Sequence, residues 1–257
     1  MISIRGRLAP TGLLLVWLIV GLASPVAADR LDPVIAQAIA NPQRTDADRA
    51  RDARDKPAAL LAFMGVRPGM RVADVLAAGG YWSELLSYVV GPTGSVISHT
   101  VKEYDAYVTD ERNARFGNGR LPNVAPLHVE LAKLDLGDQS LDLILMVMVY
   151  HDIYYHAADW PAVDRDDFFA RIRRALKPGG ELVIVDSSAL PDSGNRAAQD
   201  LHRIEAAFAK SDVERAGFSL QAESDVLSNP GDDRTLSVFD KKIQGHQDRF
   251  VFRFVKR

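Results

Sequence analysis

Cysteine is absent from the 257-residue chain. Without a thiol the protein cannot form a disulfide bond, use a thiolate nucleophile or bind zinc through cysteine. An excess of basic residues is lacking too, because 31 Lys and Arg are opposed by 34 Asp and Glu. The resulting net charge of −3 gives no electrostatic footprint for nucleic acid, so we expect no nucleic-acid partner.

A long apolar run is also missing. The apolar stretch at residues 13–22 is about half the length that a membrane-spanning helix needs. It follows Arg5 and Arg7 and precedes small residues ending at Ala28, a pattern typical of a secretory signal peptide. We therefore predict a signal peptide at residues 1–28, export to the periplasm, and no stable membrane anchor after cleavage. An uncleaved membrane anchor is the alternative.

Several catalytic motifs are absent as well. The chain has neither a glycine-rich phosphate loop ending in Lys-Ser/Thr nor the Gly-x-Ser-x-Gly turn of serine hydrolases. His151 and His156 are five residues apart, whereas a spacing of four places two ligands on one helix face. We expect no metal site.

What is present is an alternation of apolar strands and helices from residue 58 onward. Strands separated by crossover helices predict a parallel sheet that is buried on both faces. A last helix and two strands at the C-terminus predict an antiparallel hairpin. The expected fold is α/β, a Rossmann-like doubly wound sheet that is mostly parallel. The expected strands are 71–76, 95–99, 125–130, 141–149, 181–186, 218–225 and 249–255; the expected helices are 58–64, 81–90, 105–116, 166–176 and 211–216.

Residues 29–57 form an N-terminal helical extension to the domain expected at 58–257. Thr45 and Asp48 have the spacing of a helix cap. The charges of residues 48–55 alternate in sign, which is typical of a solvated helix with short-range ion pairs. The other interpretation is a lid over a cofactor cleft.

The segment from Val72 to Ser83 joins a strand to a helix through small residues. Glycine and alanine let the backbone approach a ligand, and a helix start offers unpaired N–H groups. In open parallel sheets this first turn binds nucleotide-like ligands. We expect room for such a ligand between Asp74 and Tyr81.

This segment resembles the first motif of class I S-adenosylmethionine-dependent methyltransferases, with Asp74 as the acid and Gly80 as the last glycine. Leu76 and Ala78 stand where two other glycines usually lie. Residues 141–145, 173–182 and 214–218 resemble later motifs of the family. The resemblance implies a seven-stranded methyltransferase fold with S-adenosylmethionine as cofactor. The implied cofactor-binding residues are Asp74, Ala77, Ala78, Gly79, Gly80, Tyr81, His99, Glu130 and Tyr150, with Glu130 at the adenine ring.

The second expected strand departs from the family pattern. It ends in Ser98-His99-Thr100, where the family has an acid that grips both ribose hydroxyls. Losing a charge-assisted contact weakens binding by about 1.5–3 kcal/mol, roughly ten- to a hundredfold in affinity.

Acceptor chemistry points to the end of the fourth expected strand. A hydroxyl or amine acceptor must lose a proton, and His151 and Asp152 are the candidate catalytic residues. Alternatively, both side chains only cap the turn that follows. An aromatic loop with Tyr154, Tyr155 and Trp160 lines an apolar acceptor pocket or covers the sheet edge.

Two charged segments follow the fifth expected strand. His202 and Arg203 lie on an expected helix, where they bind an acidic acceptor or pack at the surface. Asp232-Asp233-Arg234 forms a charged clamp or a local turn held by carboxylate–guanidinium bonds.

A narrower resemblance, to a group of predicted and often exported bacterial methyltransferases, covers residues 48–52, 150–152 and 229–235. The sequence therefore predicts methyl transfer from S-adenosylmethionine to a small-molecule acceptor. The alternative is a catalytically inactive binding protein of the same fold in the periplasm. A dinucleotide-dependent oxidoreductase is a third possibility, and the C-terminal helix and hairpin argue against it.

Overall fold

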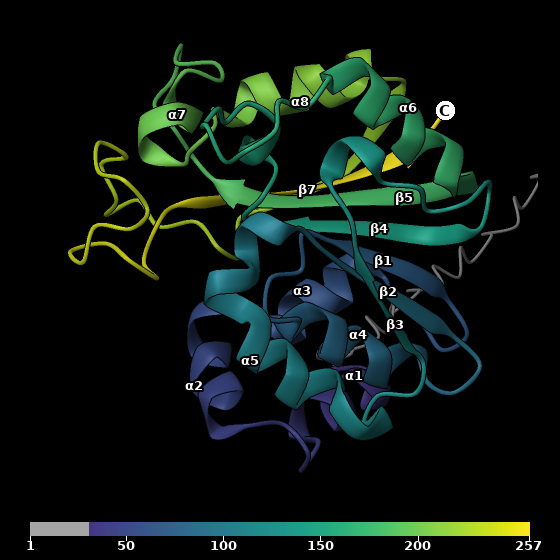
Figure 1. Cartoon of the computed structure of the whole chain (residues 1–257). Coiled ribbons are helices and arrows are strands. Elements are labelled where there is room, and N and C mark those ends of the chain that lie inside the picture. The colour runs from purple at the N-terminus through teal and green to yellow at the C-terminus, as the bar shows by residue number, and fades with distance from the viewer. Residues whose placement is uncertain (1–30) are drawn as a thin grey trace, which may run out of the picture. The chain divides into compact units, whose positions relative to one another are not determined.

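A seven-stranded sheet forms the centre of the computed structural model, which describes residues 31–257 (Figure 1). The strand order is β3-β2-β1-β4-β5-β7-β6. The first five strands are parallel, and β7 runs antiparallel to both of its neighbours. This confirms the predicted fold. The bounds are β1 Arg71–Val75, β2 Ser95–Thr100, β3 Val124–His128, β4 Leu141–Val147, β5 Leu176–Ser187, β6 Phe218–Ser224 and β7 Arg249–Lys256.

Helices cover both faces of the sheet, so the central strands are buried on each side (Figure 1). One core cluster packs α6 and α8 against the sheet, and the other packs α1, α3 and α4 against the opposite face. The helices are α1 Pro33–Ala40, α2 Asp46–Asp55, α3 Pro57–Met64, α4 Tyr81–Val90, α5 Asp105–Phe116, α6 Arg165–Ala175, α7 Ala197–Leu201 and α8 Ala206–Arg215. Short 3-10 turns lie at Lys102–Tyr104, Gly117–Gly119, Leu131–Lys133 and His151–Ile153.

The segment predicted as an extension packs onto the domain that follows it. Helix α1, which the sequence analysis did not predict, buries Ile35 and Ala38 in the core beside α4. Helix α2 begins as predicted, because the backbone N–H of Asp48 donates to Thr45 Oγ1 at 3.1 Å. Residues 31–257 therefore form one compact unit.

Helix α2 is tied to the last strand. Arg249 of β7 donates through Nη1 to Asp55 Oδ1 at 2.8 Å and through Nη2 to the carbonyl oxygen of Arg54 at 2.7 Å. Arg51 and Arg54 also bond Asp55, whose side chain is 3% exposed. These contacts join segments that are almost 200 residues apart in the chain.

Three sequence predictions differ from the observed elements. Strand β5 begins at Leu176, five residues before the predicted start, and α8 begins at Ala206 rather than at residue 211. The prediction that His202 and Arg203 lie on a helix is wrong. Helix α7 ends at Leu201, and His202 adopts a left-handed conformation with φ of 51°.

The predicted signal peptide at residues 1–28 lies outside the described residues. Within residues 31–257, no helix combines the length and the apolar character that crossing a bilayer requires.

Candidate functional site

The bend after β1, residues 76–80, is held in place by His99 of β2. The N–H of Leu76 donates to His99 Nδ1 at 3.2 Å, and the N–H of Ala77 donates to the His99 carbonyl oxygen at 2.7 Å. The other ring nitrogen of His99, Nε2, lies 2.9 Å from the carbonyl oxygen of Val129. Burial lowers the pKa of His99 to about 4, so the ring is neutral at physiological pH. Both ring nitrogens of this predicted cofactor residue are therefore used within the protein.

The glycines of the bend are in contact with α5. Gly80 caps α4 with φ of 84°, and a Cβ atom there would lie 2.4 Å from the Phe116 ring. A Cβ atom on Gly79 would meet only the flexible carboxylate end of Glu111. Glycine at position 80 is thus required by both the backbone conformation and the close approach of α5.

Two arginines of α5 hold the carbonyl groups of the bend. Arg112 Nη1 donates to the carbonyl oxygen of Ala78 at 2.8 Å, and Arg115 Nε donates to that of Gly79 at 2.7 Å. Helix α5 therefore fixes the bend from its carbonyl side. Its side chains occupy the space beside Gly79 and Gly80, where we expected room for a ligand, and the pocket described below contains no residue of the bend.

Asp74, the acid predicted at the first motif, positions α4. Its Oδ2 accepts a hydrogen bond of 2.7 Å from Ser83 Oγ, and the side chain is buried. Burial raises the pKa of Asp74 to about 6 despite the bond from Ser83.

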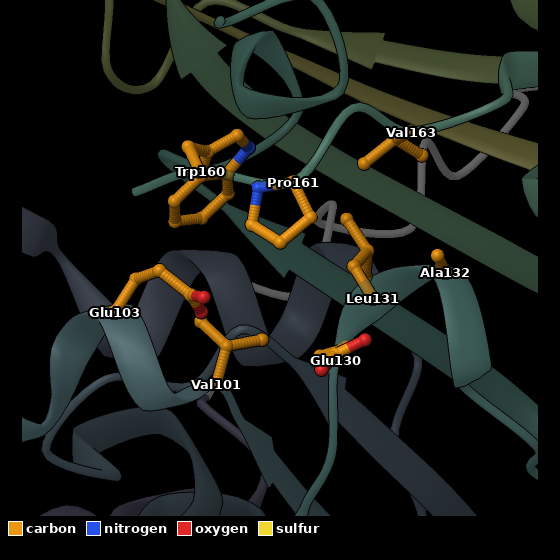
Figure 2. Close-up of a pocket in the computed structure, with 8 residues that line it drawn as sticks. All are labelled: Val101, Glu103, Glu130, Leu131, Ala132, Trp160, Pro161 and Val163. Carbon is orange, nitrogen blue, oxygen red and sulfur yellow. The ribbon is translucent and has the colours of Figure 1, made fainter. Parts of the chain in front are cut away.

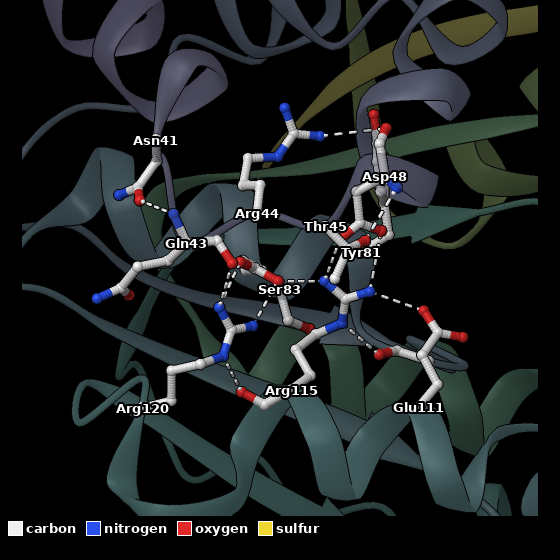
Figure 3. Close-up of polar contacts among 12 residues, drawn as sticks. Asn41, Gln43, Arg44, Thr45, Asp48, Tyr81, Ser83, Glu111, Arg115 and Arg120 are labelled. Atoms are coloured by element: carbon white, nitrogen blue, oxygen red, sulfur yellow. Dashed lines mark hydrogen bonds and ion pairs between the residues drawn. The ribbon is translucent and has the colours of Figure 1, made fainter.

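A buried ion network lies between α2, α4 and α5 (Figure 3). Arg115 bonds Asp48 at 2.9 and 3.0 Å, contacts Glu84, and bonds Glu111 at 2.7 Å. Asp48 and Glu84 have side-chain exposures of only 7% and 1%. The short-range ion pairs predicted for α2 are present, as between Arg51 and Asp55, but the helix is not solvated along its acidic face, which is buried against the bend.

Tyr81 also faces α2. Its hydroxyl group donates to Asp52 Oδ1 at 2.7 Å, and the guanidinium of Arg51 lies 4.1 Å from its ring centroid. Since Asp52 bonds Arg44 as well, this predicted cofactor residue serves in the described structure to hold α2 over the bend.

A small pocket opens at the carboxyl ends of β2 and β3 (Figure 2). Figure 2 shows Trp160 and Pro161 across the pocket from Val101 and Glu103. Its free volume of about 10 Å³ has room for about one water molecule, far below the 300–1,000 Å³ that is common for whole-ligand sites. The pocket is lined by Val101, Glu103, Glu130, Leu131, Ala132, Trp160, Pro161 and Val163. Glu130, predicted at the adenine ring, is thus one of its walls.

The end of β2 beside this pocket carries an unpaired polar atom. Thr100 is 1% exposed, and its hydroxyl oxygen has no hydrogen-bond partner among the described residues. Buried hydroxyl groups without a partner are rare in folded proteins. Thr100 and Glu103 thus place polar groups at and just beyond the end of β2, where the family has its ribose-binding acid.

A second polar group lies at the ends of β4 and β5. The backbone N–H and Nδ1 of His151 donate to the two carboxylate oxygens of Asp186 at 2.8 and 2.9 Å. Burial alone lowers the pKa of His151, but Asp186 and Asp152 raise it to about 9. Burial raises the pKa of Asp152, whose Oδ2 accepts a bond of 2.8 Å from Tyr104.

The aromatic residues that surround His151 and Asp152 lie partly in the pocket and partly in the core. The Tyr150 and Tyr154 hydroxyl groups both donate to Asp212, and Tyr150 is fully buried. Trp160 lines the pocket, and its Nε1 donates to the carbonyl oxygen of Asp152 at 3.1 Å. Trp160 thus contacts both the pocket and the backbone of Asp152, the residue after His151.

Arg203, Asp232 and Arg234, from the charged segments after β5, are structural. Arg203 is fully buried and donates to Asp232 Oδ2 at 2.8 Å and to the carbonyl oxygen of Ser188. The N–H of Arg234 donates to Asp232 Oδ1 at 3.0 Å, which agrees with the local-turn interpretation. Asp232 therefore anchors the turn from both sides.

The sequence did not point to Glu103 or Asp186, and it did not predict that His202 lies beside His151. Glu103 and Asp186 each stand at or just beyond the carboxyl end of a parallel strand, which is the signal that could have found them. His202 reaches the His151 group only through the turn that ends α7, and no local pattern indicates that contact.

Comparisons with known proteins agree with this architecture. Residues 75–184 match the family model described as a methyltransferase domain. The chain is 27% identical over 128 residues to the ubiquinone/menaquinone biosynthesis C-methyltransferase UbiE of Ectopseudomonas mendocina, covering 50% of this chain and 46% of the relative. It is 29% identical over 132 residues to a demethylmenaquinone methyltransferase of Staphylococcus aureus, covering 50% and 48%. The chain thus spans about half the length of these relatives.

The fold itself has a solved counterpart. A SAM-dependent methyltransferase from Aquifex aeolicus superposes with a TM-score of 0.55 at 21% identity, covering 83% of this chain and all of the other. The sheet order and this superposition show the seven-stranded fold of these methyltransferases, and the match of residues 75–184 shows a methyltransferase domain within the chain.

Proposed function

We propose that the protein transfers a methyl group from S-adenosylmethionine to a small-molecule acceptor. The observation that carries the proposal is the pocket at the carboxyl ends of β2 and β3, where ligands bind in open parallel sheets. When bound, the cofactor supplies an electrophilic methyl group on a sulfonium. The protein contributes binding, orientation and exclusion of water.

The side chains that line the pocket have the chemistry that the nucleoside part of this cofactor needs, and the pocket must widen to admit it. Val101 and Leu131 offer apolar surface for an adenine ring, and Glu130 offers a carboxylate beside it. Glu103 is the group that would receive the ribose hydroxyls. A carboxylate that accepts a hydrogen bond from each of the two ribose hydroxyl groups would compensate for the missing acid in β2.

We expect the methyl acceptor to bind at the carboxyl end of β4, next to the pocket. His151 is fixed in orientation by Asp186, and Asp152 Oδ2 is already bonded to Tyr104. Asp152 Oδ1 is therefore the atom that would meet an acceptor proton, and the protonated His151 would orient the acceptor through Nε2. Trp160 separates this position from the nucleoside pocket while touching both.

The cofactor assignment is tested by calorimetry with S-adenosylmethionine and S-adenosylhomocysteine on the full chain. We expect micromolar binding that falls about ten- to a hundredfold in Glu103→Gln, because a charge-assisted bond is lost. Asp110→Asn is the matched control, since Asp110 is an exposed acid of α5. Absence of binding at millimolar ligand would contradict the proposal.

Demethylmenaquinone is the first acceptor to assay, because the name of a relative gives it as substrate. Transfer of a labelled methyl group from S-adenosylmethionine is the measurement. We expect Asp152→Asn to lower the rate of transfer and to leave cofactor binding unchanged.

We also propose that residues 1–28 direct export to the periplasm, on the basis of their charge and apolar pattern. N-terminal sequencing of the protein from a bacterial periplasmic fraction is the test. A mature chain that begins at Asp29 is expected, and recovery of only the uncleaved chain in the cytoplasm would contradict it.

A further inference from the structure

Three potential metal ligands converge at the ends of β4 and α7. His151 Nε2 lies 3.3 Å from Asp152 Oδ1 and 3.3 Å from His202 Nδ1. The third separation, from His202 Nδ1 to Asp152 Oδ1, is 4.0 Å. A point equidistant from three atoms with these separations lies about 2.1 Å from each, which is the length of zinc bonds to imidazole and carboxylate.

The surrounding contacts orient each ligand atom toward this point. His151 Nδ1 donates to Asp186, so Nε2 is the nitrogen that faces His202 and Asp152. A histidine whose second nitrogen donates to a carboxylate is the usual arrangement of a metal ligand. Asp152 uses Oδ2 for Tyr104, which leaves Oδ1 at the shared point.

Two buried carboxylates in the group also favour a cation. Asp152 and Asp186 are buried, with side-chain exposures of 9% and 0%. Within residues 31–257, neither carboxylate forms a salt bridge with a lysine or an arginine. Buried carboxylates are paired with a cation or coordinate a metal. The cation here is either a proton on the imidazoles or a metal ion at the point they share.

The backbone of His202 supports a specific role for this side chain. His202 has φ of 51°, a left-handed conformation that costs a residue other than glycine about 1 kcal/mol or more. Its ring packs against Tyr155 and the exposed Phe239, with centroids 4.8 Å away in each case. The strained turn places the ring over His151 rather than in solvent.

We propose that His151, Asp152 and His202 bind one divalent transition-metal ion, with Asp186 orienting His151. Two imidazoles and one carboxylate suit zinc and the neighbouring first-row metals rather than magnesium or calcium. Three protein ligands leave the fourth position of a tetrahedral ion open. We assign that position to an oxygen or nitrogen donor of the methyl acceptor, and this part rests on the proposed function. With the ion bound, Asp152 Oδ1 and His151 Nε2 would be ligands rather than proton acceptors, and the ion would lower the pKa of the acceptor group.

The test is titration of the chelator-treated full chain with Zn²⁺ by calorimetry, and with Co²⁺ by visible absorption. We expect one ion per chain and an intense tetrahedral Co²⁺ spectrum. Affinity should fall at least a hundredfold in His202→Ala, and about ten- to a hundredfold in the orienting variant Asp186→Asn. His202 is half-buried, so its removal leaves the core intact.

His156→Ala is the matched control, because His156 is exposed and lies in the loop that follows His151 and Asp152. It should bind Zn²⁺ as the unmodified protein does. Lack of one-to-one binding by the unmodified protein, or equal affinity in His202→Ala, would overturn the metal site. S-adenosylmethionine binding is measured in parallel without metal. Loss of cofactor binding with Zn²⁺ binding retained would count against the proposed function alone.

Discussion

The buried guanidinium of Arg115 offers a sharp test of how the bend after β1 is held. Its side chain is 4% exposed and bonds Asp48, Glu84, Glu111 and the carbonyl oxygen of Gly79. The substitution Arg115→Met keeps much of the volume and removes every one of these bonds. Glu84 retains Arg120, but Asp48 loses its arginine partner inside the protein.

Removing one partner of a buried ion pair costs about 3–5 kcal/mol, because the remaining charge is buried without compensation. For a chain of this size, 1 kcal/mol shifts the melting temperature by about 2–4 °C. We therefore expect Arg115→Met to lower the free energy of unfolding in urea by about 3–5 kcal/mol and the melting temperature by roughly 6–20 °C.

Arg171→Met is the control, since Arg171 pairs with Asp167 on the solvent-facing side of α6 at 2.8 Å. An exposed pair of this kind contributes below about 1 kcal/mol. In Asp48→Asn/Arg115→Met the double substitution should cost less than the sum of the single ones. If Arg115→Met is no more costly than Arg171→Met, the network does not stabilise the bend.

Two further predictions concern the same region. Gly80→Ala should lower the free energy of unfolding by more than about 1 kcal/mol, because φ is 84° and the Phe116 ring fills the space. Gly79→Ala should cost less, because the nearest atoms belong to the flexible carboxylate of Glu111. Equal losses in urea denaturation would refute this. Arg51, Arg54 and Arg249 outweigh burial and lower the pKa of Asp55 to about 2. A lowered carboxyl pKa stabilises the fold above the unfolded pKa near 4, so about 2 kcal/mol should be lost as pH falls from about 4 to 2. Asp55→Asn should flatten the measured dependence of unfolding on pH in that range, and an unchanged slope would contradict the assignment.

Much of the fold was predictable where the chain carries local end signals. The predicted bounds 81–90 and 105–116 coincide with α4 and α5, because Gly91 and Gly117 follow these helices directly. The start of α8 was missed since its cap residue, Glu205, makes no capping bond. Helix α1 carried the signal Asp32-Pro33 but is only eight residues long and polar sequence surrounds it.

The site was less predictable because it is assembled across strands. Glu130 and His151 could be found, since each closely follows an apolar strand. The fate of His99 could not, because its two ring nitrogens bond backbone groups 23 and 30 residues away. The position of His202 depends on a strained turn that composition does not reveal.

The link between Arg249 and Asp55 constrains the order in which the molecule is completed during synthesis. Helix α2 leaves the ribosome early, yet its anchor belongs to the last strand to be made. Until β7 enters the sheet, Asp55 lacks that partner. Completion of β7 thus adds the last contact of α2, at its C-terminal end. In a chain truncated before β7, a protease should cleave this end of α2 faster than in the full chain.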